Sequence, residues 1–144
     1  MKKLLTYIRR MPRTRGFGIQ SPWSYQFVRQ VAAGASEGPQ PLQGGTFDER
    51  LAQFLNRMGT TEDHILRISA ENLAEPACTA FLNDGNDKRV LIVSNLYQSP
   101  QALQRWQQLA QDERVTVSFD LFDQGICFFI KSTTKQHYKI NYKK

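Results

Sequence analysis

Long apolar runs are missing from this sequence. Its apolar stretches, such as Val90 to Val93, are only a few residues long, far below the roughly 20 residues of a membrane-spanning helix. Arg9 and Arg10 stand where the apolar centre of a secretion signal would lie, and no small-residue cleavage site follows. We therefore expect no integral membrane segment and predict a cytoplasmic protein.

Cysteine and histidine are also scarce. Cys78 and Cys127 are the only cysteines, and they form neither a CxxC motif nor part of a histidine cluster. This pattern predicts no metal site and two buried thiols. His64 and His137 have no serine, cysteine or carboxylate at a motif spacing, so we predict structural roles for both.

Acidic residues are absent from the first fifteen positions, where six cations are found. Five more cations follow Asp123, and the intervening stretch is acidic, although the net charge of the chain is +6. A basic end can bind phosphate or an anionic membrane, but such a run is more often a solvated face. Nucleic-acid binding is therefore an unfavoured alternative, and its candidate anion-binding residues are Arg9, Arg10, Arg13 and Arg15.

At 144 residues, with 40% hydrophobic and 22% charged residues, the chain has the composition of one globular domain. We predict an N-terminal helical docking arm over residues 1–33, a Gly/Pro-rich loop over 34–45 and an α/β domain over 46–144. The arm has two apolar stripes at helical spacing. Their residues, our candidates for an interaction surface, are Leu4, Leu5, Ile8 and Met11, and then Trp23, Phe27 and Val31 on a helix over 22–33.

The α/β domain begins with a capping box. Thr46 and Glu49 start a helix that Gly59 ends. The pattern then predicts a strand over 64–69, a helix over about 73–82 with Pro76 in its early turns, a buried strand over 89–94 and a helix from Ser99 to about 111.

From Arg114 the apolar residues alternate, which predicts a long strand. We expect Asp123 to Gly125 to be the loop of a hairpin, with Gly125 in the left-handed conformation, 126–130 as the returning strand, and Asp120 and Asp123 as turn or exposed residues. Residues 138–142 suggest a short last strand or an ordered tail. We predict one core between the last helix and the hairpin, made of Leu103, Trp106, Val115, Val117, Phe119 and Phe128.

Several segments resemble bacterial class I S-adenosylmethionine (SAM) methyltransferases, in particular small O-methyltransferase-like proteins. The segments are Gly18-Ile-Gln-Ser-Pro-Trp23, the capped helix from Phe47 to Met58, Val90 to Val93, the helix bearing Trp106, and most specifically Arg114 to Phe129 with Lys135-Gln-His-Tyr138. The resemblance implies a reduced Rossmann-like sheet of about four strands ending in an antiparallel hairpin, with N-terminal helices.

The resemblance also indicates what is missing. A complete fold of that class needs about six βα units of roughly 30 residues, and the stretch from Thr46 to Lys144 suffices for about three. The family's glycine-rich SAM loop and ribose-binding acid have no counterpart, because no glycine lies between Ser69 and Gly85. We therefore expect no cofactor.

Two alignments with the family remain open. The strand ending at Ser69 corresponds either to the family's fourth strand or to its first, with the deletion directly after it. In the first case the family's carboxylate positions read Ser69 to Asn72 and Ser94-Asn95. The weak candidates for ligand binding are then Glu71, Asn72 and Asn95.

The sequence thus favours a truncated, non-catalytic methyltransferase-like protein that acts by association. A homo-oligomer or a full-length methyltransferase is the expected partner, because the deletion would expose a sheet edge and apolar helix faces. The alternatives are a residual SAM-dependent O-methyltransferase or small-ligand binder, and a nucleic-acid or anionic-membrane module that uses the basic arm.

Overall fold

The computed structural model describes residues 22–34, 42, 45–131, 135–140 and 142. Within them the chain has four α-helices and one open, mixed sheet of five strands. The expected α/β fold is confirmed, with one strand more than the predicted four. The chain divides into two compact units, Met1–Gly59 with Lys139–Lys144, and Thr60–Tyr138.

The first unit contains the predicted helix over 22–33, but only its first turn is α-helical. Helix α2 spans Pro22–Gln26 and continues as the π-helix η1, Phe27–Ala32, in which the Ala33 N–H donates to the Val28 carbonyl at 2.8 Å. Nothing in the sequence indicated these wider turns.

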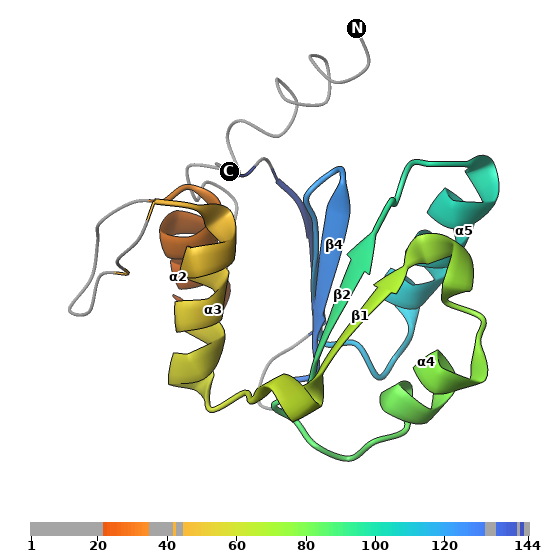
Figure 1. The fold of residues 1–144 in the computed structure, drawn as a ribbon, viewed down its shortest axis with the longest axis horizontal. Coiled ribbons are helices and arrows are strands. Elements are labelled where there is room, and N and C mark those ends of the chain that lie inside the picture. The colour runs from red at the N-terminus through yellow and green to blue at the C-terminus, as the bar shows by residue number, and fades with distance from the viewer. Residues whose placement is uncertain (1–21, 35–41, 43–44, 132–134, 141, 143–144) are drawn as a thin grey trace, which may run out of the picture. The chain divides into compact units, whose positions relative to one another are not determined.

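Helix α3, Phe47–Met58, also belongs to the first unit and lies beside α2 and η1 (Figure 1). Its predicted capping box is confirmed, since the Thr46 hydroxyl accepts from the Glu49 N–H and donates to the Glu49 carboxylate. Gly59 ends the helix with a left-handed φ of 86°. Leu4, Leu5, Ile8, Met11 and the four N-terminal arginines of our prediction lie outside the described residues.

The second unit contains the short 3-10 helices η2, Glu62–His64, and η3, Ala70–Asn72, and the helices α4, Pro76–Leu82, and α5, Pro100–Gln111. Helix α4 starts three residues later than predicted. Pro76 restricts the residue before it and lacks an N–H, so it occupies the first helical position rather than an early turn.

Three strands of the sheet run in one direction. The sheet has the order β1-β2-β4-β3-β5, with β1 Ile65–Ser69, β2 Val90–Ser94, β3 Val117–Asp120, β4 Gln124–Phe128 and β5 Gln136–Lys139. β1 and β2 are parallel, and β4 is antiparallel to both β2 and β3. β1, β2 and β3 therefore end at the same border of the sheet.

The hairpin between β3 and β4 differs from the prediction. Its loop is Leu121 to Asp123, and the left-handed residue is Phe122, with a φ of 80°, not Gly125. Gly125 lies inside β4. The position of Gly125 near the turn suggested a left-handed backbone. A glycine is needed there for another reason, because a Cβ at this position would clash with the ring of Trp106.

The predicted core is correct only in part. Helices α4 and α5 lie on one side of the sheet (Figure 1), and the core there includes Trp106, Val115, Cys127 and Phe129, with Leu103 packed against it. Val117, Phe119 and Phe128 are on the opposite face of the strands. Both faces of β3 are buried, so the apolar alternation could not indicate which face meets α5.

Candidate functional site at the carboxyl ends of the strands

The carboxyl ends of β1, β2 and β3 bring three loops to one border of the sheet. These ends are Ser69, Ser94 and Asp120, the first two of which pair in register. In open α/β sheets, ligands bind at this border. This border is therefore the candidate ligand-binding site of the sheet.

Asp120 is the most buried charged side chain at this border, with 1% of its surface exposed. The Tyr97 hydroxyl donates to Asp120 Oδ2 at 2.7 Å, and the Phe122 N–H donates to Oδ1 at 2.8 Å. The prediction of an exposed side chain for Asp120 is wrong, because its carboxylate is buried beneath Tyr97. The predicted turn role is confirmed by the bond from the Phe122 N–H in the hairpin loop. Asp123 is exposed, as predicted.

Two residues other than glycine adopt left-handed backbone at the same border. Asn95 has a φ of 60° and Phe122 a φ of 80°, and the Asn95 N–H donates to the Asp123 carbonyl at 3.0 Å. Asparagine tolerates this conformation, whereas a bulky residue such as phenylalanine rarely adopts it. The ring of Phe122 stacks on Tyr97 at 4.8 Å between centroids, so the strained loop presents a half-exposed aromatic pair.

The predicted ligand-binding candidates are exposed at this border. Glu71 and Asn72 belong to η3, directly after β1, and Asn95 follows β2. The Glu71 carbonyl accepts from Arg105. The described residues include no cluster of histidine, cysteine and carboxylate side chains that could hold a metal ion. Ligand binding by these three side chains stays a prediction.

The sequence did not predict a contact between the side chains of Ser118 and His137. Ser118 Oγ lies 2.6 Å from His137 Nδ1, because β5 is next to β3 in the sheet. Ser118 is fully buried, so its hydroxyl cannot reach a substrate in solution, and the contact holds β5 against β3. His64 Nδ1 lies 2.9 Å from the Thr61 hydroxyl. Only the strand order could have revealed the first contact.

Both cysteines are buried free thiols, as predicted. Burial raises the pKa of the Cys127 thiol, and it raises that of Cys78 as well. A thiolate is the reactive form of cysteine, so neither side chain is poised for nucleophilic or redox chemistry.

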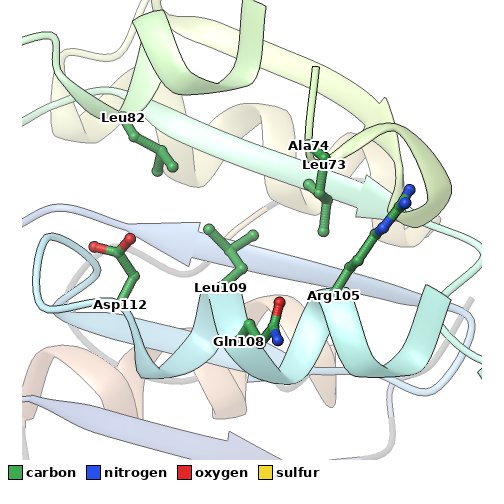
Figure 2. A pocket seen from close by; sticks show the side chains of 7 residues that line it. All are labelled: Leu73, Ala74, Leu82, Arg105, Gln108, Leu109 and Asp112. Atoms are coloured by element: carbon green, nitrogen blue, oxygen red, sulfur yellow. The ribbon is translucent and has the colours of Figure 1, made fainter. Parts of the chain in front are cut away.

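A cavity of about 180 Å³ lies between α5 and the segment from η3 to the end of α4 (Figure 2). Leu73, Leu82 and Leu109 provide apolar walls, and Arg105 and Asp112 stand toward its two ends. The sequence did not predict this cavity, because its lining comes from segments more than twenty positions apart.

Within the first unit, two of the predicted interaction residues contact helix α3. The ring of Trp23 packs edge-on against Phe54 at 5.5 Å between centroids, and that of Phe27 does so at 5.4 Å. Val31 is buried, and its carbonyl accepts from Arg50 Nε at 2.9 Å. An intermolecular role for these residues stays a prediction.

No family model, curated protein or solved structure matched this chain in our comparisons. Among the helices of the described segments, none is long and apolar enough to cross a membrane.

Proposed function

We propose that this protein is a non-catalytic, methyltransferase-like chain that acts by associating with another chain through the free edge of its sheet. The observation that carries the proposal is the position of β1. It is the terminal strand of the sheet (Figure 1), and nothing in the described part of the chain pairs with its outer side. An unpaired strand edge is a template for another strand.

The side chains of β1 fit this role. Ile65, Leu66 and Ile68 are only half-buried, and Leu66 and Ile68 pack against the core between the sheet and α5. A partner strand would extend the sheet and cover this apolar surface. Each side chain that becomes fully buried contributes roughly 1.5 to 3 kcal/mol.

The resemblance to methyltransferases supports a loss of catalysis. A parallel pair followed by an antiparallel hairpin is the sheet ending that the resemblance implies, and β1, β2, β3 and β4 have this arrangement. Where the family has a glycine-rich loop for SAM, β1 leads into η3 without a glycine. A second copy of this chain is the partner we propose, since two identical edges can pair antiparallel about a two-fold axis.

Light scattering of Ile68→Lys tests this proposal. A lysine on an edge strand opposes pairing, because its ammonium group must stay in water while its stem can still cover the sheet. We expect the wild-type chain to have twice the monomer mass and Ile68→Lys to be monomeric at the same concentration. Gln104→Lys is the matched control, because it adds the same charge at an exposed position of α5, and it should remain dimeric.

A monomeric wild-type chain at every soluble concentration would contradict the second copy as partner. If that chain instead formed a complex with a full-length methyltransferase, and Ile68→Lys abolished the complex, the partner would be the methyltransferase. Equal masses for Ile68→Lys and the wild type would show that β1 is not the interface.

Titration with SAM tests the proposal that this chain has no catalytic activity of the methyltransferase type. We expect a dissociation constant of a millimolar or weaker, so ligand at that concentration stabilises the fold by less than about 0.5 kcal/mol. A melting shift of several degrees with SAM or S-adenosylhomocysteine, measured by scanning fluorimetry, would contradict a chain without a cofactor site.

A further inference from the structure

We infer that the cavity beside α5 binds a small aliphatic carboxylate, with the carboxylate on Arg105 and the hydrocarbon tail among the leucines. This site is separate from the β1 edge. It rests on the lining of the cavity and on the distribution of charge around it.

The apolar part of the cavity is built by three leucines. Leu82 and Leu109 are buried, Leu73 is half-buried, and all three line the space that Figure 2 shows between the two segments. Ala74 adds a small side chain to this wall. An apolar cavity of about 150 Å³ is known to accept benzene, so about 180 Å³ accommodates a tail of about five carbons.

The cation at one end of the cavity has no counter-ion among the described residues. Arg105 Nη1 donates to the Glu71 carbonyl, and no carboxylate in the described segments forms an ion pair with this guanidinium. A guanidinium has five N–H donors in a planar fork that suits a carboxylate. The remaining donors of this half-buried side chain are therefore suited to an anion.

The carboxylate toward the other end is already neutralised. Asp112 accepts from the Arg114 backbone N–H and Nε at 2.9 Å each, and from Nη2 at 2.7 Å. Hydrogen bonds from the Arg114 side chain hold the pKa of Asp112 below its usual value. Asp112 follows Arg105 by seven residues, about 10 Å along α5, so its compensated charge does not oppose an anion at Arg105.

The chemistry of the ligand follows from the apolar wall of leucines and from the charge of Arg105. A free inorganic anion would leave the leucines uncovered, and a neutral hydrocarbon would leave Arg105 without a counter-charge. A monocarboxylate with about six carbons satisfies both. Gln108 lies on the rim between Arg105 and Asp112.

Titration of the full-length chain with hexanoate, followed by two-dimensional amide NMR, tests the inference. We expect shifts at the backbone amides of Leu73, Ala74, Arg105 and Leu109, with a dissociation constant of about a millimolar, which is reasonable for so few ligand atoms. Arg105→Gln should weaken hexanoate binding about tenfold or more. The matched control Arg67→Gln removes the same charge from the exposed face of β1 and should bind as the wild type does.

Two further measurements distinguish the contribution of the leucine wall to hexanoate binding from that of Arg105. Hexanol and propionate should each bind more weakly than hexanoate, because one lacks the charge and the other most of the tail. Ala74→Phe, at an exposed position of the wall, should obstruct the cavity and abolish hexanoate binding without lowering the melting temperature. The inference is overturned if hexanoate shifts none of these amides, if Arg105→Gln binds hexanoate as tightly as the wild type, or if hexanol binds as well as hexanoate.

Discussion

Gly125 lies against the ring of Trp106, so this position has no space for a side chain. A Cβ there would lie 2.3 Å from Trp106 Cη2 and 2.6 Å from Cζ2, closer than atoms approach without a clash. Trp106 has 1% of its surface exposed, within the core between α5 and the sheet. The indole therefore packs directly on the backbone of β4, and one missing methyl group determines how closely helix and strand approach.

Gly125→Ala should consequently lower the free energy of unfolding by about 2 to 3 kcal/mol, because the ring and the strand must separate in a well-packed core. Urea unfolding followed by tryptophan fluorescence measures this loss. Gly85→Ala is the control, since nothing lies within 4 Å of a Cβ at that position, and it should change the free energy by less than about 0.5 kcal/mol. Equal stabilities for the two variants would contradict this packing.

Helix α5 is fixed at both of its ends. Ser99 caps the first turn by accepting from the Ala102 N–H at 3.0 Å, and Pro100 follows at the first helical position. After Gln111, Asp112 binds Arg114, and the Asp112 carbonyl accepts from Lys135 Nζ at 2.7 Å. These contacts lead the chain from the helix into β3.

The stability of this connection should depend on pH. Since the folded-state pKa of Asp112 is lowered, its stabilising effect is fully present above the ordinary aspartate pKa of about 4 and is lost as the pH falls through the lower, folded value. The wild type should therefore be more stable than Asp112→Asn at pH 7, and the difference should shrink below about pH 4. Denaturant unfolding from pH 7 to pH 2 measures this change.

Asp63→Asn provides the matched control, because Asp63 is exposed and has no ion pair within the described part of the chain. It should lose stability with acid as the wild type does. A difference between Asp112→Asn and the wild type that stays constant down to pH 2 would show that the Asp112 carboxylate does not act through its charge.

At the scale of the whole molecule, α2 and η1 form part of a packed unit with α3. Phe54 of α3 lies against the rings of both Trp23 and Phe27. Arg50 of the same helix donates to the Val31 carbonyl at 2.9 Å and to the Gly45 carbonyl at 2.6 Å. Burial lowers the pKa of Arg50, but the guanidinium stays charged, so removing these two carbonyls would take away two of its hydrogen bonds.

Deletion of residues 1–33 should therefore lower solubility or change the oligomeric state, because it exposes Phe54 and removes one acceptor of Arg50. Light scattering and thermal unfolding of a chain that starts at Gly34 measure both effects. A truncated chain that is soluble, equally stable and unchanged in assembly would show that this segment is dispensable. It would also favour an anionic partner for Arg9, Arg10, Arg13 and Arg15.

The sequence by itself determined the elements that depend on near neighbours. Thr46 with Glu49, Gly59, and Ser99 with Pro100 set the limits of α3 and the start of α5, since capping involves residues within one turn. The apolar run at Val90 to Ser94 likewise identified a strand buried within the sheet. These signals are local, so they could be read without the fold.

Only the tertiary structure decided which residues meet across the chain. The contact of Ser118 with His137, the burial of Asp120 under Tyr97 and the approach of Gly125 to Trp106 all depend on the order of the strands and on which face of the hairpin meets α5. Both faces of β3 are buried, so the period-two pattern is the same for either orientation. The choice between them is made by packing across the sheet, which no short stretch of sequence encodes.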